Sequence, residues 1–326
     1  MKSLSYLNKY LLKYKWRLIL GIIFTVASNI FGAYMPIIVG DAVDEMTALQ
    51  NDLDFKEKLV GVALTLFGIY MLFSFGKGFF LFFMRQTIIV TSRFIEYDLK
   101  NEIYNQYQNL TYRFYKKNNT GDLMNRISED VSKVRMYLGP GIMYTINLVA
   151  LFVIVVYQML QVNVEMTIYV LIPLPIMSYL IYKVSARMNR QSEQVQREQS
   201  WISTLVQETF SGVRVIKAYS REAETKTQFD RSAEAYKDKS MSLTLTNSLF
   251  MPTIMLLIGL STIITVYIGI LLTYDNKVTP GNITSFIFFV NMLTWPFASV
   301  GWVTSLVQRA AASQERINEF LNEKSN

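Results

Sequence analysis

Six long runs of apolar residues dominate the sequence. They lie near residues 17–40, 59–83, 139–160, 164–183, 248–272 and 281–305. Each run is long enough for a helix to cross a hydrocarbon core of about 30 Å, which takes roughly 20 residues. The runs are continuous, whereas the strands of a membrane barrel alternate in hydrophobicity. The first run is too long for a signal peptide and lacks a cleavage site. The pattern predicts an all-α membrane protein with six transmembrane helices.

Two long polar segments, 84–138 and 184–247, separate these runs, and both are predicted to be helical. Their apolar residues recur every three or four positions, and neither segment contains a proline. Each has one interior glycine near its middle, Gly121 and Gly212. We therefore expect a helix out, a break and a helix back, with legs of about 25 residues reaching about 35–40 Å beyond the membrane. Such a turn could receive a soluble partner, or the segment could be a rigid stalk without a coupling role.

The basic residues are concentrated on alternate sides of the apolar runs. Residues 1–17 carry five basic residues and no acidic one, whereas loop 41–58 carries six acidic residues and two basic ones. Of the 32 basic residues, 28 lie on the side of the termini and the two long segments. This excess predicts cytoplasmic termini in a multi-pass protein of a bacterial plasma (inner) membrane. The net charge of +7 thus reflects topology and contact with lipid headgroups, and we expect no nucleic-acid partner.

Several kinds of chemistry are excluded by composition. The sequence has no cysteine and no histidine, so disulfides, thiolate or imidazole metal sites, histidine bases and cysteine nucleophiles are ruled out. It also has no G-x-x-x-x-G-K-[ST] sequence, and the nearest similar tripeptide, Gly76-Lys77-Gly78, lies inside an apolar run. We therefore expect no catalytic residue and no metal site in this chain.

Four stretches resemble the membrane part of ABC exporters, in the same order. Phe114–Val131 is similar to the first intracellular loop of that family, F-Y-x-x-x-x-T-G-D-L-x-x-R-x-x-x-D-V, and Glu208–Tyr219 to the second, E-x-x-x-G-x-R-x-I-K-A. Thr279–Gly281 precedes the sixth run, and Arg309–Ile317 follows it, as family members have them. The likeness covers essentially the whole chain.

This resemblance implies a function that the residues alone leave open. Members of the family export lipids, drugs or other amphipathic substrates by alternating access, and they pair as homodimers or heterodimers whose spans four and five wrap the partner subunit. An ATPase domain, absent from this chain, commonly follows in the same polypeptide or is a separate chain, and ATP and magnesium are expected there. The alternative is a membrane receptor or scaffold that signals through helical stalks.

The resemblance also assigns residues to coupling with the ATPase domain. In the family, the two excursions end in coupling helices that dock on it. The residues expected to do so lie near Tyr115–Asp122 and Gly212–Arg221. They include Tyr115, Asn119, Thr120, Gly121, Asp122, Gly212, Val213, Arg214, Lys217, Ser220 and Arg221.

Candidates for a substrate cavity lie inside the apolar runs. Lys77 could face a cavity and bind an anionic headgroup or substrate, or it could snorkel or pair with a polar neighbour. Asn29 could line the same cavity or hydrogen bond to another helix. One face of the sixth run could form an adaptable pocket or provide ordinary packing and lipid contact. Its residues are Phe288, Met292, Trp295, Ser299 and Trp302, of which the first four are the candidates for the cavity.

Two further features concern the first two runs. Gly32, Pro36 and Gly40 recur every four residues in the first run, a spacing that allows close helix packing or a hinge. Arg85 lies near the inner membrane interface, where we expect it to anchor the second helix.

Overall fold

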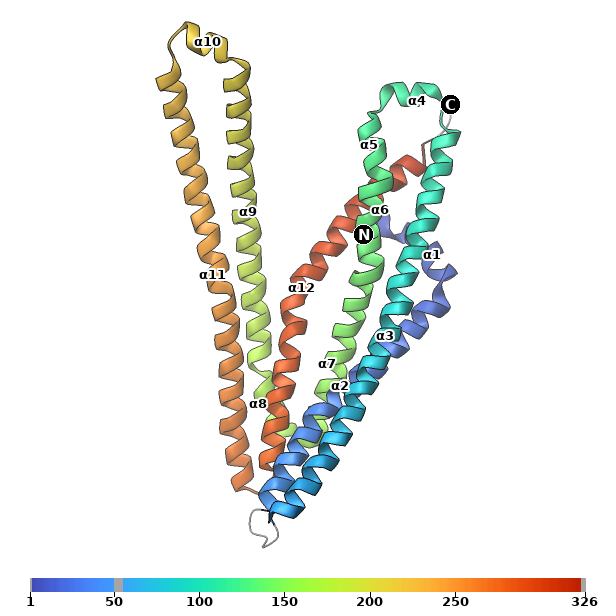
Figure 1. Ribbon diagram of the computed structural model, residues 1–326, viewed down its shortest axis with the longest axis vertical. Helices are drawn as coiled ribbons and strands as arrows, with labels where there is room; N and C mark the ends of the chain where they lie inside the picture. Colours follow the sequence, from blue (N-terminus) through green and yellow to red (C-terminus); the bar gives the residue numbers. More distant parts are fainter. Residues whose placement is uncertain (1, 50–54, 324–326) are drawn as a thin grey trace. The chain divides into compact units, whose positions relative to one another are not determined.

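The computed structural model describes residues 2–49 and 55–323, and nearly all of these are helical. The long helices are α2 (Lys15–Leu49), α3 (Phe55–Asn109), α7 (Ile142–Val162), α9 (Pro173–Ser211), α11 (Glu222–Tyr274) and α12 (Pro280–Leu321). The short ones are η1 (Lys2–Leu7), α1 (Asn8–Lys13), α4 (Tyr112–Lys117), α5 (Thr120–Asn125), η2 (Arg126–Asp130), α6 (Val131–Met136), η3 (Tyr137–Gly141), α8 (Val164–Leu171) and α10 (Val213–Ala218). The described part contains no strand, which confirms the all-α fold (Figure 1).

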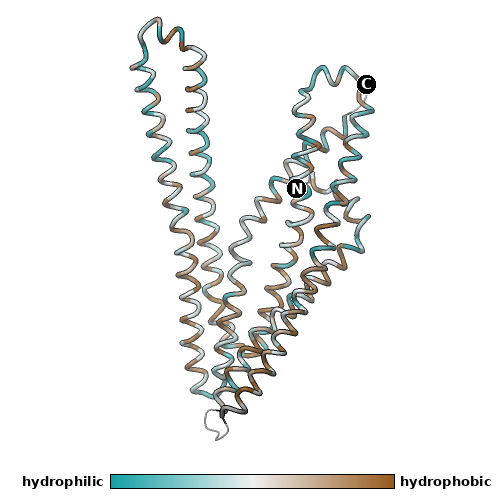
Figure 2. Tube along the Cα trace, viewed as in Figure 1, coloured by the Kyte–Doolittle hydropathy of each residue, from teal (hydrophilic) through white to brown (hydrophobic). Residues whose placement is uncertain are grey.

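Six helical stretches in the described part are long and apolar enough to cross a membrane, as predicted. One of them runs without interruption over Thr120–Val162, through the π-helical turns η2 and η3. Figure 2 shows hydrophobic residues gathered along one part of the long helices and hydrophilic residues toward α4 and α10. A helical span satisfies its backbone hydrogen bonds internally, which the hydrocarbon region requires.

The chain divides into two compact units. The first contains residues 1–170 and 262–326, and the second contains residues 171–261. In the first unit, α2 packs against α3, α7 and α12.

An apolar core lies at the polar end of the first unit. It joins the N-terminal segment, α3, α5, α6 and the end of α12 through buried side chains that include Leu7, Leu99, Val131, Ile317 and Phe320. The five named side chains come from four elements, of which the N-terminal segment and α12 lie at opposite ends of the described sequence. The first excursion is therefore a packed body rather than an isolated stalk.

Polar contacts hold the N-terminal segment against α3. Lys9 Nζ lies 2.6 Å from Glu102 Oε1, the Tyr6 hydroxyl donates to the same oxygen at 2.6 Å, and the Tyr10 hydroxyl donates to Oε2. Lys13 pairs with Asp98 at 2.7 Å. Burial alone would raise the pKa of Glu102, but the hydrogen bonds from these donors outweigh it and lower the pKa.

The second unit is a helical hairpin. Helix α9 and the first part of α11 run antiparallel and are joined by α10 (Figure 1). A side-chain hydrogen bond of 2.9 Å from Gln191 to Ser242 links the two long helices.

Both excursions go out and back as predicted, but their breaks differ. Gly212 follows the last residue of α9, at the predicted break. Gly121 lies instead inside the first turn of α5, and the chain turns at Asn118 and Asn119, which have extended backbones. An asparagine side chain can hydrogen bond to its own neighbouring backbone, which favours turns and helix caps without a glycine.

Candidate functional site

The tip of the first excursion consists of α4 and the start of α5. Asn119 caps α5, because its side-chain oxygen accepts a hydrogen bond of 2.9 Å from the Gly121 backbone N–H. Asp122 lies in the first turn of the same helix, where an acidic side chain is favoured, and pairs with Arg126 at 2.8 Å. Thr120 begins the helix. Four of the predicted coupling residues thus shape this turn.

Two tyrosine hydroxyls connect the helices of the first tip, α4 and α5, to α3. The Tyr115 hydroxyl donates to the Tyr107 carbonyl, and the Tyr107 hydroxyl donates to the Leu123 carbonyl. Burial raises the pKa of Tyr107 to about 12. Tyr115, which the sequence suggested as a docking residue, also fixes the position of α4 relative to α3.

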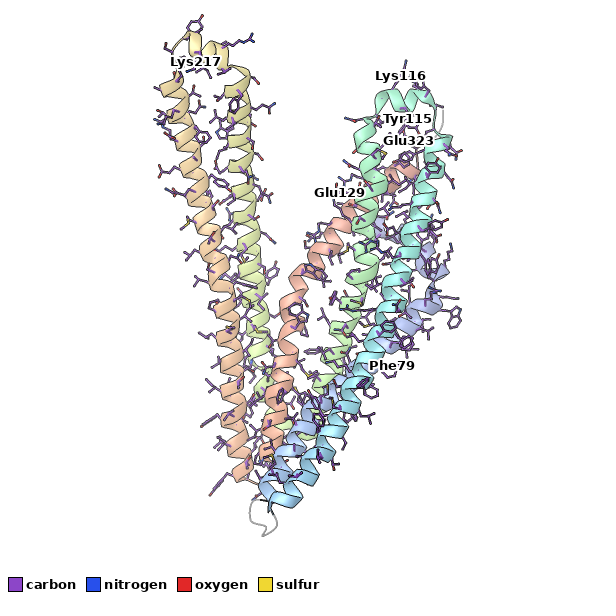
Figure 3. The ribbon with its side chains drawn as sticks, viewed as in Figure 1. Phe79, Tyr115, Lys116, Glu129, Lys217 and Glu323 are labelled. Atoms are coloured by element: carbon purple, nitrogen blue, oxygen red, sulfur yellow. The ribbon has the colours of Figure 1, made fainter. Side chains whose placement is uncertain are left out.

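The outer surface of the first tip is basic. Arg113, Lys116 and Lys117 have no acidic partner among the residues that the structure describes, and Lys116 lies 5.1 Å from the Tyr112 ring centroid. The Tyr112 side chain is 75% exposed. Figure 3 shows Tyr115 and Lys116 on α4. This surface suits an acidic partner with an apolar contact point.

The second tip is the short helix α10. Gly212 follows the last residue of α9. Ser220, two residues after the last residue of α10, has a φ of 50°, a left-handed conformation typical of helix termini. The Arg221 backbone N–H then donates to the Ile216 carbonyl at 3.0 Å. The helix is thus bounded on both sides by defined backbone turns.

Ion pairs brace the return from α10 into α11. Lys217, which Figure 3 places on α10, lies 3.0 Å from Glu222, and Arg221 Nε lies 2.6 Å from Glu224. A backbone hydrogen bond at the start of α11 and the Lys217 ammonium lower the pKa of Glu222. Lys217 and Arg221 are therefore engaged within the chain, whereas Arg214 has no ion-pair partner in the described part.

Large apolar side chains are exposed at the second tip. Phe210 is 73% exposed and Tyr219 is 75% exposed, and Val213 and Val215 are exposed beside them. A cluster of this kind on a polar segment marks an interaction surface. Tyr219 lies within the stretch 212–221 that the resemblance assigned to coupling, whereas Phe210 lies just before it. The aromatic character of Phe210, two residues before Gly212, was a signal that could have extended the stretch.

A buried carboxylate attaches the end of α12 to the first excursion. Asp130 is 3% exposed. Its Oδ1 accepts hydrogen bonds from Ser313 at 2.8 Å and from Arg316 Nη2, and its Oδ2 accepts one from Arg316 Nε at 3.1 Å. Next to this pair, Phe320 packs on Tyr107 with ring centroids 4.8 Å apart. These contacts connect segments 186 residues apart, and the sequence reasoning assigned them no role.

Two of the intramembrane candidates lie beside α2. Asn29 donates a 3.1 Å hydrogen bond to Asn147 on α7, so its amide joins two helices. The Lys77 side chain lies along Gly32, where an added Cβ would be 3.5 Å from the ammonium nitrogen. The ammonium has no hydrogen-bond partner in the described part of the chain, so the position of Lys77 is compatible with a ligand-binding role.

The candidates on α12 lie in different surroundings. Phe288 and Trp295 are exposed within this chain, and Met292 is half-buried. Ser299 is buried and donates a 2.9 Å hydrogen bond to the Pro296 carbonyl of its own helix. The structure brings the first three to one accessible face and turns the Ser299 hydroxyl toward its own backbone.

At the end of the first unit away from its tip, α2 and α12 approach each other closely at two glycines. Gly281 on α12 faces Gly40 on α2, and a Cβ at Gly281 would clash with the Gly40 carbonyl and lie 2.5 Å from the Asp44 carboxylate. That carboxylate accepts hydrogen bonds from the Gly281 N–H at 2.7 Å and from Thr279 at 2.5 Å. Gly40, one of the three residues spaced by four in the first run, therefore allows close packing of α2 against α12. The same contact explains the glycine at position 281 and the hydrogen-bonding threonine at position 279.

Comparisons with known proteins agree with these features. The family described as ABC transporter transmembrane region matches residues 18–297. The chain is 28% identical to the probable multidrug resistance ABC transporter ATP-binding/permease protein YheI of Bacillus subtilis, covering 99% of this chain and 54% of that protein. It is 25% identical to the ATP-dependent lipid A-core flippase of Syntrophus aciditrophicus, covering 88% of this chain and 47% of the flippase. The chain spans about half the length of these relatives.

Proposed function

The chain belongs to the ABC transporter transmembrane family, and we propose that it is the membrane domain of an ATP-driven exporter of amphipathic substrates such as lipids or drugs. The names of the matched relatives, a multidrug transporter and a lipid flippase, support this substrate class. The family match supports an exporter and not the receptor or scaffold alternative. ATP and Mg²⁺ bind an ATPase domain outside this chain.

The observation that carries this proposal is the pair of defined tips. Each excursion ends in a short helix, α4 or α10, and exposed aromatic side chains lie within α4 and directly beside α10. Buried contacts within the first unit fix the first tip, and backbone turns with ion pairs fix the second. A partner that contacts a rigid tip can displace the helices behind it, as coupling between ATP hydrolysis and transport requires.

A second transmembrane subunit completes the assembly. The polar part of the second unit exposes Trp201 and Phe229 at a place that lipid would not cover. A pair of antiparallel helices cannot bury both of its faces alone. A second subunit covering these residues accounts for their exposure in this chain.

The charge pattern supports the orientation of the protein. We place both termini and both tips in the cytoplasm of a bacterium, because the basic residues gather on that side. The exported substrate then enters from the cytoplasm or the inner leaflet.

The test is to replace Phe210 and Tyr219 together by alanine, with the chain joined to or expressed with its ATPase. Exposed aromatic residues carry much of the binding free energy at protein interfaces. We expect uptake of an amphipathic dye into inverted vesicles, relative to ATP hydrolysis, to fall by about tenfold or more, which corresponds to about 1.4 kcal/mol or more of lost coupling.

The matched control is Tyr97→Ala, which removes an exposed aromatic side chain from α3, away from both tips. It should leave the ratio of transport to ATP hydrolysis unchanged. Full coupling in the Phe210 and Tyr219 double variant would show that α10 is not the docking surface.

A further inference from the structure

The first unit contains an open cavity of about 380 Å³ between α3, η3 and α7. Arg85, Gln86 and Tyr144 supply its polar groups, and the remaining wall is apolar and includes Ile89 and Met143. Its volume lies at the lower end of the range for small-ligand pockets, about 300–1,000 Å³. A mixed wall of this kind suits a ligand with one charged group and an apolar remainder.

The polar groups of this cavity are free to bind a ligand. Arg85 and Gln86 are exposed, and neither they nor the Tyr144 hydroxyl have a side-chain hydrogen-bond or ion-pair partner among residues 2–49 and 55–323. Elsewhere on the same helix, Arg93 pairs with Glu96 at 3.0 Å. Arg85 is therefore an arginine that the chain holds beside a cavity without neutralising its charge.

The cavity lies at the depth of phospholipid headgroups. The second apolar run starts at Leu59, and Arg85 lies about 39 Å of helix beyond it. This length exceeds the hydrocarbon thickness of about 30 Å, so Arg85 lies outside the hydrocarbon core. Arg17 of α2, which stacks 4.7 Å from the Phe94 ring, marks a level further toward the predicted cytoplasmic side. Tyr144 and Trp302 meet edge to face at 5.3 Å, and tyrosine and tryptophan are the residue types enriched at membrane interfaces.

We propose that this cavity binds the phosphate of an anionic phospholipid from the cytoplasmic leaflet. The Arg85 guanidinium donates to the phosphate oxygens, Gln86 and the Tyr144 hydroxyl add neutral donors, and one acyl chain lies on the apolar wall. A guanidinium matches the planar, bidentate geometry of phosphate oxygens, and basic pockets between helices on the cytoplasmic side bind anionic headgroups. The site goes beyond export, because it requires neither ATP nor transport.

The chemistry favours a lipid over a free phosphate ion. An inorganic phosphate would use the donors but leave the apolar wall exposed to water. An anionic phospholipid covers both parts, and its negative charge is concentrated in the leaflet that the cavity opens on.

Native mass spectrometry of the purified chain in detergent tests the site directly. It measures bound lipid and the number of chains in each complex together. Phosphatidylglycerol and phosphatidylcholine are added separately, and millimolar inorganic phosphate is added as a competitor. We expect phosphatidylglycerol to bind about tenfold more tightly, because both lipids carry the phosphate but the choline cation of phosphatidylcholine offsets its charge and is repelled by Arg85. Inorganic phosphate should not displace the lipid.

Variants assign the preference to the cavity. Arg85→Gln should remove the preference for phosphatidylglycerol and Arg85→Lys should keep most of it. Arg93→Gln, the matched control on the same helix, should retain it fully. Arg85 has no partner in the described part, so its replacement leaves the fold intact.

Three results would overturn the proposal. The first is an unchanged lipid preference in Arg85→Gln. The second is displacement of the lipid by inorganic phosphate, which would make the site one for a soluble anion. The third is that Arg85→Gln changes the number of chains in each complex but not the amount of bound lipid. That result would show that a second copy of the chain, and not a lipid, covers the cavity. None of these results bears on export.

Discussion

Replacing Arg316 by alanine should destabilise the attachment of α12 more than replacing Asp130 by asparagine. Asp130 is 3% exposed, whereas half of the Arg316 side chain reaches solvent. Without Arg316, a buried carboxylate keeps Ser313 as its side-chain donor. With asparagine at 130, the guanidinium can hydrate and the amide oxygen still accepts from Ser313.

The magnitudes follow from these surroundings. Removing one partner of a buried ion pair costs about 3–5 kcal/mol, because the other charge is left buried. Replacing the carboxylate removes charge-assisted hydrogen bonds and leaves no buried charge, which costs about 1–2 kcal/mol. The double variant should therefore be more stable than Arg316→Ala alone, by about 2 kcal/mol.

Hydrogen–deuterium exchange of peptides from residues 310–321 measures this attachment. A gain of about 2 kcal/mol corresponds to roughly 30-fold slower exchange in the double variant than in Arg316→Ala. Lys133→Ala is the control, because Lys133 forms a more exposed pair with Glu129 on the same helical stretch and should cost less than about 1 kcal/mol. The reasoning is refuted if the double variant exchanges as fast as Arg316→Ala or faster.

Three further predictions concern other parts of the fold. Gly281→Ala should cost about 1–3 kcal/mol and lower the melting temperature, because its Cβ meets α2, whereas Gly78→Ala, which meets no atom within 4 Å, should be neutral or slightly stabilising; equal melting temperatures would contradict the close packing. The pKa of Glu102 is lowered in the folded chain, so the N-terminal segment should be attached at full strength above the unfolded pKa of about 4.3 and weaken as the pH falls through the lower folded value. Hydrogen–deuterium exchange of residues 2–13 measures the attachment, and exchange that rises as the pH is lowered from about 8 to about 6 would contradict this. A double-mutant cycle with Asn29→Ala and Asn147→Ala should give a coupling of about 0.6–1.7 kcal/mol in thermal unfolding, and additive effects would exclude their hydrogen bond.

The long helices could be predicted because local signals are strong in this sequence. Continuous apolar runs marked the spans, and the three- and four-residue spacing with no proline marked the excursions. The same signals misplaced the first break. Gly121 was the obvious helix breaker, but Asn119 caps the helix two residues earlier and lets the glycine enter its first turn.

Contacts between distant segments could not be predicted in this way. Nothing local to Asp130 indicates that it meets Arg316, and nothing local to Asp44 indicates that it binds the start of α12. The π-helical turns η2 and η3 also interrupt the regular spacing on which the sequence reasoning relied. The same limit applied to the cavity beside Arg85, which depends on the packing of α3 against α7.

The central claim is that the tips α4 and α10 dock on an ATPase, and cross-linking tests it most directly. The sequence contains no cysteine, so single cysteines at Tyr112, Tyr219 and Trp201 can be introduced without background from residues 1–326. A short thiol-to-amine cross-linker should join positions 112 and 219 to the ATP-binding chain or domain, but not position 201, which lies before the last two turns of α9. Cross-links from position 201 alone, or none from either tip in an active complex, would contradict the account.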